Sequence, residues 1–98
     1  MIDRFYKQPS EKFNVSIDFN NVLGDDETIS SYVLTCININ DNSDTSTDVI
    51  DSDSNTTVSI TIKVKAGADG ENHKITVKIT TSDSNIFEKD VLMKVVEE

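Results

Sequence analysis

The chain has 98 residues, of which 36% are hydrophobic, and its formal net charge is −9. A chain of this length folds as one domain with a modest core. Its strong negative charge repels phosphate backbones and anionic lipids, which argues against nucleic acid and membrane surfaces as direct partners.

The cysteine count and the hydropathy of the sequence indicate in which compartment the protein is made. Cys36 is the only cysteine, so no intrachain disulfide can form, and its strand-forming neighbours predict a buried, unreactive thiol. The start of the chain does not combine basic residues with an apolar run, so we expect no signal peptide. No apolar stretch approaches the roughly 18 residues of a membrane span. We therefore expect a soluble protein made in a cytoplasm.

Residues 1–12 are mostly polar and include the only proline, Pro9. We interpret them as a polar N-terminal leader in front of a single domain that spans residues 13–98. The leader carries two aromatic residues, Phe5 and Tyr6, which are candidate contacts for a partner.

Two strands follow the leader. Residues 13–19 alternate apolar and polar side chains, which is typical of a strand with one buried face. A turn or short helical bend around Gly24 separates it from residues 28–39, which are apolar on both faces. Such a strand is either central in a sheet or covered on its second face by a partner. Val33, Ile37 and Ile39 are therefore candidate contacts.

Residues 40–56 contain five aspartates and no basic residue, which predicts a long acidic loop with one short edge strand around residues 47–51. Residues 51–55 match the first half of a calcium-binding loop. However, Thr56 stands where that loop needs glycine, and Ile62 stands where it needs a bidentate glutamate. We therefore expect a solvated acidic loop and no metal site.

The most regular alternation lies in residues 57–66 and 73–81, two predicted strands joined by residues 67–72. Gly67 and Gly70 mark this connection as a hairpin turn whose backbone needs positive φ. The polar positions of the two strands carry four lysines, which we interpret either as edge protection or as a basic stripe for an acidic neighbour. These lysines are Lys63, Lys65, Lys74 and Lys78.

The last strand is predicted in residues 86–96, after a turn at residues 82–85. Lys89 breaks its apolar face, which indicates a bulge or a strand end. Together these elements make an all-β, single-domain, immunoglobulin-like β-sandwich of about six to seven antiparallel strands, with a small barrel as the alternative. Apolar strand faces need a second sheet to cover them, which favours the sandwich.

Chemistry for catalysis or cofactor binding is not found. His73 is the only histidine, and its place in the alternation directs it inward. No nucleophile motif, phosphate-binding glycine loop or zinc-ligand spacing occurs. We therefore expect a protein without enzymatic activity or cofactor, which acts through its surface.

Two blocks of sequence resemble a family of small phage virion proteins of the fiber-tail adaptor type, over residues 8–95. The first block has a proline and an acid in the leader, then Asp-Phe, Leu-Gly and an Asp-x-Thr-Ile-x-Ser segment. These are Pro9, Glu11, Asp18, Phe19, Leu23, Gly24, Asp26, Thr28, Ile29 and Ser31. The second block is a glycine–acid–glycine turn followed by a strand that ends in Ile-Thr-Thr-Ser. It comprises Gly67, Asp69, Gly70, His73, Val77, Ile79, Thr80, Thr81 and Ser82, with His73 where the family usually has tyrosine.

The resemblance implies an immunoglobulin-like, non-enzymatic structural protein of the virion, assembled in the host bacterial cytoplasm. It would act in the tail, neck or fiber-attachment region by contacting other virion proteins, either in a ring or as another homo-oligomer. Two other classes remain open: a carbohydrate- or surface-binding module, and an acidic host-directed regulator. Few aromatic residues argue against the first, and acidic residues clustered in loops argue against the second.

Overall fold

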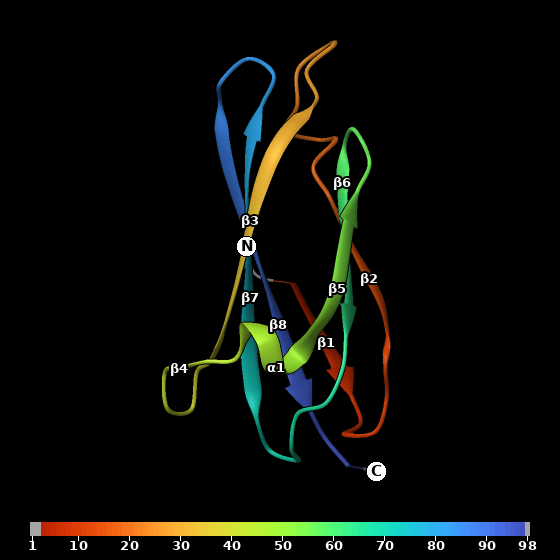
Figure 1. Cartoon of the computed structure of the whole chain (residues 1–98), viewed down its shortest axis with the longest axis vertical. Coiled ribbons are helices and arrows are strands. Elements are labelled where there is room, and N and C mark those ends of the chain that lie inside the picture. The colour runs from red at the N-terminus through yellow and green to blue at the C-terminus, as the bar shows by residue number, and fades with distance from the viewer. Residues whose placement is uncertain (1–2, 98) are drawn as a thin grey trace.

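The computed structural model describes residues 3–97 and consists of two β-sheets packed face to face (Figure 1). The first sheet contains, in spatial order, β1 (Asp3–Lys7), β8 (Ile86–Val95), β7 (Asn72–Thr81), β3 (Ile29–Asn38) and β4 (Ser43–Asp44). The second contains β2 (Phe13–Asp18), β6 (Ser59–Val64) and β5 (Ile50–Asn55). A single helical turn, α1 (Ser46–Val49), precedes β5. The predicted β-rich, single-domain arrangement of two sheets is confirmed.

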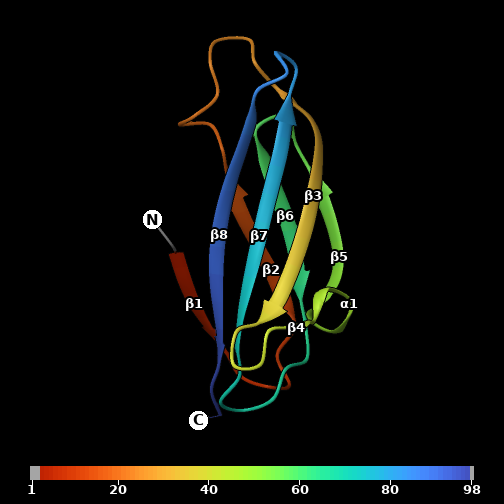
Figure 2. The ribbon, with the colours of Figure 1, turned by 90° about the vertical axis from the view of Figure 1, so that its left-hand side faces the viewer.

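The number and direction of the strands differ from the prediction of six to seven antiparallel strands. The described residues form eight strands, and β1 runs parallel to β8, whereas every other pair is antiparallel. Thus residues 3–7, expected as part of a polar leader, form the edge strand of the larger sheet (Figure 2). The reason is that Phe5 and Lys7 both turn toward the interior. Met1, Ile2 and Glu98 lie outside the described residues.

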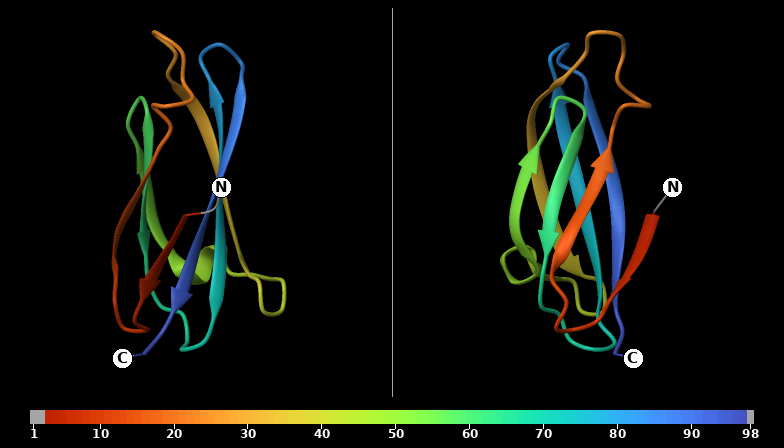
Figure 3. Two further views of the ribbon diagram at one scale, coloured as in Figure 1. Left: turned by 180° about the vertical axis from the view of Figure 1, so that it is seen from behind. Right: turned by 90° about the vertical axis from the view of Figure 1, so that its right-hand side faces the viewer.

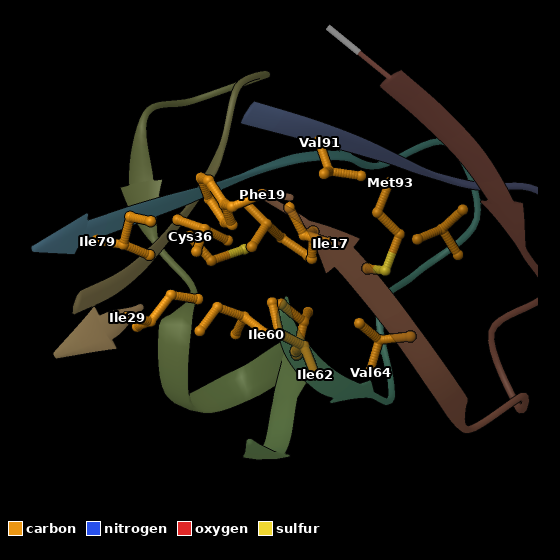
Figure 4. Close-up of a cluster of buried hydrophobic side chains, with 14 residues drawn as sticks. Ile17, Phe19, Ile29, Cys36, Ile60, Ile62, Val64, Ile79, Val91 and Met93 are labelled. Carbon is orange, nitrogen blue, oxygen red and sulfur yellow. The ribbon is translucent and has the colours of Figure 1, made fainter. Parts of the chain in front are cut away.

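The core fills the space between the sheets with aliphatic side chains from the inward positions of both (Figure 4). The alternation predicted for β6 and β7 is confirmed, because every second residue in each strand is buried. Each fully buried side chain of this kind contributes roughly 1.5–3 kcal/mol. The innermost apolar residues are Phe19, Ile60, Ile62, Val64, Ile75, Val77, Ile79, Met93 and Val95.

The acidic segment 40–56 is more regular than expected. Helical turn α1 occupies residues 46–49, where an edge strand was predicted, and the edge strand β5 follows at residues 50–55. The side chain of Val49 is buried in the hydrophobic core and so anchors this helical turn. Asp51 lies between Lys12 and Lys65, at 3.2 and 3.7 Å from their ammonium groups. Thus one apolar anchor and these ion pairs order a segment whose composition resembles a loop.

The connection from β6 to β7 is a crossover between sheets and not a hairpin, which corrects the sequence-based interpretation. It begins at Ala66, with φ of 55°, and contains Gly67 and Gly70, each with φ of 89°. The predicted need for positive φ at both glycines is therefore confirmed. Figure 3 shows the crossover at one end of the sandwich, close to the end of β8. No helix in residues 3–97 is long and apolar enough to cross a bilayer.

Candidate functional site

The outer face of the five-stranded sheet carries apolar side chains that the rest of the chain does not cover. Val33 is 60% exposed and Ile39 is 43% exposed, while Ile37 between them is half-buried. Their neighbours on β3, Leu34 and Cys36, turn inward. The two-sided strand predicted from the sequence is therefore real, and its outward side faces solvent in the isolated chain.

Basic residues border this apolar row. Across the β3–β7 ladder, Val33 lies beside Lys78 and Ile37 beside Lys74. Further along the sheet, Lys94 of β8 lies above the ring of Tyr6, with its ammonium group 5.9 Å from the ring centre. We call this surface the basic–apolar face; it comprises Tyr6, Val33, Ile37, Ile39, Lys74, Lys78, Leu92 and Lys94.

The charges of the basic–apolar face are largely unneutralised. Among the side chains that the structure describes, those of residues 4–97, the only lysines with a carboxylate within 4.0 Å are Lys12 and Lys65, both on Asp51. The acidic residues on the same face are Glu88, next to Lys78 in the ladder, Asp90, which accepts a hydrogen bond from Thr76, and Asp44, next to Ile37 in the β3–β4 ladder. On a chain with net charge −9, this face thus carries as many lysines as carboxylates around its apolar row.

The four lysines of the predicted stripe do not lie together. Lys74 and Lys78 are on β7 of the larger sheet, whereas Lys63 is on β6 of the smaller sheet and Lys65 follows it. Since β6 and β7 belong to different sheets, their outward side chains point to opposite sides of the sandwich. The prediction of one continuous stripe is wrong because it assumed a hairpin between these strands.

The two aromatic residues of the N-terminal segment have different surroundings. Phe5 turns inward and packs edge-on against Phe13, with ring centres 5.9 Å apart. Tyr6 turns outward and is 62% exposed. Tyr6 therefore remains a candidate contact, whereas the exposed surface of Phe5 is reduced by packing within the chain.

Gly24 belongs to a loop organised by a buried carboxylate. The amide of Gly24 donates a hydrogen bond to Oε1 of Glu27, at 2.7 Å. The other oxygen of Glu27 accepts from Thr81 and from Asn85, at 2.5 and 2.8 Å. These hydrogen bonds hold the pKa of Glu27 below its usual value, with the Gly24 amide as the largest cause. Glu27 thus fastens the β2–β3 loop to the β7–β8 turn.

A second buried polar cluster lies at the opposite end of the sandwich. Nδ1 of His73 is 3.0 Å from the hydroxyl of Thr45, and Nε2 is 3.1 Å from Oε1 of Glu71. The same hydroxyl is 3.3 Å from the sulfur of Cys36. Burial raises the pKa of the Cys36 thiol, and the thiol contacts threonine instead of the imidazole. The cluster satisfies buried polar atoms and gives no accessible nucleophile.

Within residues 3–97, no three histidine, cysteine or acidic side chains are grouped closely enough to hold a metal ion. The acidic residues of the calcium-like segment instead lie along β5, where Asp53 accepts a hydrogen bond from Tyr32 at 2.6 Å. This contact joins β3 of the larger sheet to the edge strand β5 of the smaller sheet.

A groove opens on the opposite edge of the sandwich, between β1 and β2, and encloses about 460 Å³. Its apolar lining comes from Phe5, Val15, Ile17 and Val91, and Arg4 and Lys89 add positive charge. Lys89 turns inward without any bulge in the β7–β8 ladder, which corrects the predicted irregularity. It donates to the carbonyl of Asp18, at 2.6 Å, and lies over the ring of Phe19.

Several of these surface residues were not singled out in the sequence. Leu92 and Lys94 occupy the outward positions of β8, and the alternation of that strand could have indicated them. Arg4 could not be found in this way, because its place at the groove depends on the packing of β1 beside β8 and near β2. The sequence alone gives no signal for that packing.

The comparisons with known proteins agree with the absence of catalytic chemistry. Residues 7–94 match the model of one protein family, described as podophage GP4 fiber-tail adaptor protein gp77. No curated protein and no protein of solved structure matches the chain. The family match favours the adaptor over the carbohydrate-binding module and the host-directed regulator. This chain therefore belongs to the podophage fiber-tail adaptor family, and it is a non-enzymatic structural component of the virion tail that connects fibers to the tail.

Proposed function

We propose that the basic–apolar face is the surface through which this adaptor binds one of the two proteins that it joins. The observation that carries the proposal is the exposure of Val33 and Ile39 on the same sheet face as Lys74, Lys78 and Lys94. The outward positions of the smaller sheet, by contrast, carry serine, threonine, asparagine, one aspartate, Asp18, and a single lysine, Lys63.

The partner that fits this surface is an acidic protein surface with apolar side chains at its centre. Aliphatic contacts supply the buried area, while carboxylates on the partner neutralise the lysines at the rim. Charge complementarity of this kind mainly raises the association rate and selects the partner.

The strand order supports an immunoglobulin-like assignment of the sandwich. In immunoglobulin-type sandwiches one sheet contains strands C, F and G, and the other contains B, E and D. If β1 precedes strand B, then β2, β3, β5, β6, β7 and β8 take the places of B, C, D, E, F and G. The basic–apolar face is then the exposed side of the C–F–G sheet.

Complementation of a phage whose own copy of this gene is interrupted tests the proposal. Val33→Asp changes an exposed position and should leave the free energy of unfolding within about 0.5 kcal/mol of wild type. Ser52→Asp, on the exposed edge strand β5, adds the same charge outside the basic–apolar face. Thermal unfolding of both purified variants establishes that they fold.

Quantitative mass spectrometry of gradient-purified particles then gives the amounts of this chain and of fibers per tail. We expect Val33→Asp to lower either the amount of this chain or the amount of fibers per tail at least tenfold. Ser52→Asp should leave both amounts unchanged. Wild-type amounts of both in Val33→Asp particles would contradict the proposed role of this face.

We further propose that several copies of this chain surround the tail, following the symmetry of the particle. Repeated attachment sites on a symmetric tail call for one adaptor at each equivalent position. The same mass spectrometry gives the ratio of this chain to the portal protein. A ratio that is a simple multiple of the portal ring supports the arrangement, and a single copy per particle excludes it.

A further inference from the structure

A connecting protein needs two separate contact surfaces, and the proposed function uses one. The free edges of the two sheets are β1, β4, β5 and β2. Of these, β4 has two residues and β5 carries Asp51 and Asp53 beside an irregular register with β6. Such features protect an edge against the addition of another strand. β1 contains only five residues.

Strand β2 has no comparable protection. Its six residues pair with β6 in a continuous register without a bulge, and Asp18 at its end is the only charged residue. Hydrogen-bonded pairs alternate along an antiparallel ladder. Because the amide of Phe19 donates to the carbonyl of Val58, the main-chain groups of Asn14, Ser16 and Asp18 point away from β6. In agreement, the carbonyl of Asp18 accepts a hydrogen bond from Lys89.

The groove described above lies directly beside this free edge. It is lined by Val15 and Ile17 of β2 and, across the opening, by Phe5 and Val91. An extended segment laid along β2 would place every second side chain in this apolar groove while its main chain pairs with Ser16. Figure 3 shows β1 and β2 diverging on this side of the sandwich.

The positive charge at the groove indicates that the incoming segment carries a negatively charged side chain. Arg4 is exposed and lines the groove, and Lys89, also in its lining, donates hydrogen bonds to oxygen atoms of Asp18 and Asn21. The carboxylate of Asp18 accepts a hydrogen bond from the main-chain amide of Asn20. A carboxylate on the incoming segment would therefore pair with Arg4 at the rim.

We propose that the free edge of β2 binds an extended segment of the second protein that this adaptor joins, by addition of one β-strand. The segment has alternating apolar side chains and an acidic residue opposite Arg4. This inference rests on the proposed function, since it assigns the partner that the basic–apolar face does not bind.

Ser16→Pro tests the strand addition specifically. Proline removes the outward amide of Ser16 and leaves the pairing of β2 with β6 intact, because proline is tolerated on an edge. Ser16→Ala is the matched control, since it also loses the hydroxyl contact with Thr61 but keeps the amide. Arg4→Glu is a second variant, which reverses an exposed charge and does not depend on the fold tolerating proline.

The readout is photo-crosslinking in assembled phage particles that carry p-benzoylphenylalanine at position 14 of this chain. A second site at position 55, on the edge of β5, is the comparison. We expect position 14 to crosslink to one segment of a different virion protein, with alternating apolar residues and an acidic residue. Ser16→Pro and Arg4→Glu should lower the yield at least tenfold, Ser16→Ala less than twofold.

Three outcomes overturn the inference. One is a crosslink from position 14 to another copy of this chain, which would indicate self-pairing of β2. The others are the absence of any crosslink and an unchanged yield in the folded variants. If Ser16→Pro does not fold, the identity of the protein crosslinked to position 14 in the wild-type chain decides. Because Val33 and Ser16 lie on different sheets, the results of Val33→Asp and of the crosslinking at β2 can fail independently.

Discussion

The ammonium group of Lys7 donates a hydrogen bond to the main-chain carbonyl of Ala66, 2.5 Å away, and so joins the first strand to the crossover between the sheets. The same group donates to the carbonyls of Gln8 and Pro9, at 2.8 and 3.1 Å. Lys7 is only 1% exposed, and this burial lowers the pKa of its ammonium group. A charged side chain in the core thus holds the edge strand in place.

Lys7→Met should destabilise the fold by about 1–3 kcal/mol, because it leaves buried carbonyls without a donor. Urea unfolding measures this loss. Lys12→Met is the control, because the exposed ion pair of Lys12 with Asp51 contributes at most about 1 kcal/mol. Equal stabilities of the two variants would show that the hydrogen bonds of Lys7 do not hold β1.

The two crossover glycines should differ in their tolerance of alanine. Both have φ of 89°, where a side chain costs roughly 1–2 kcal/mol. A Cβ atom at Gly67 would also lie 2.8 Å from Val95, whereas at Gly70 it would meet nothing within 4 Å. We therefore expect Gly67→Ala to be the more destabilising by about 1–3 kcal/mol in thermal unfolding. The reverse order would contradict the packing of the crossover on β8.

Acid should weaken the fold through Glu27 and Glu71. Hydrogen bonds lower the pKa of both carboxyls in the folded chain, for Glu71 chiefly that from the amide of Ala68. The unfolded chain therefore binds protons at higher pH than the folded chain, so stability rises with pH through this range. The stabilisation is complete above the unfolded pKa, near 4.5, and disappears as the pH falls through the lowered values.

Glu27→Gln and Glu71→Gln should each be less stable than wild type at pH 7 and lose less stability between pH 5 and pH 2. Chemical unfolding across that pH range measures the slope. Asp25→Asn, on the exposed part of the β2–β3 loop, is the control. A variant whose slope equals that of wild type would show that its carboxylate does not contribute.

The thiol of Cys36 should report on global unfolding. It is buried and in contact with Thr45, and its raised pKa, due to burial, disfavours the reactive thiolate. We expect modification by a thiol reagent at pH 8 to be at least a hundredfold slower in the native chain than in urea. Rapid modification of the native chain would indicate local opening of the β3–β4 end.

The sequence predicted those parts of the fold that depend on local pattern. Alternation placed Val77 and Ile79 inward and put Val33 on the strand face opposite Leu34, since strand faces follow from the period of two. The prediction of positive φ at Gly67 and Gly70 was also correct, because positive φ is a local requirement of the backbone. Pairing between distant strands has no such local signal, so the crossover at Gly67 was mistaken for a hairpin.

The prediction of the candidate site was limited for the same reason. Val33, Lys74 and Lys78 were identified and lie on one face, but Lys63 was assigned to the same stripe and lies on the opposite sheet. The partner strand of β1 and the burial of Lys7 depend on contacts with residues far along the chain. Composition alone therefore made this segment resemble a polar leader.

Cryo-electron microscopy of the intact tail, at a resolution that shows side chains, tests the central claim most directly. If this adaptor works as proposed, Val33 and Lys78 are buried against an acidic surface of one virion protein. A tail in which both side chains face solvent, while the chain contacts fiber and tail through other surfaces, would contradict it.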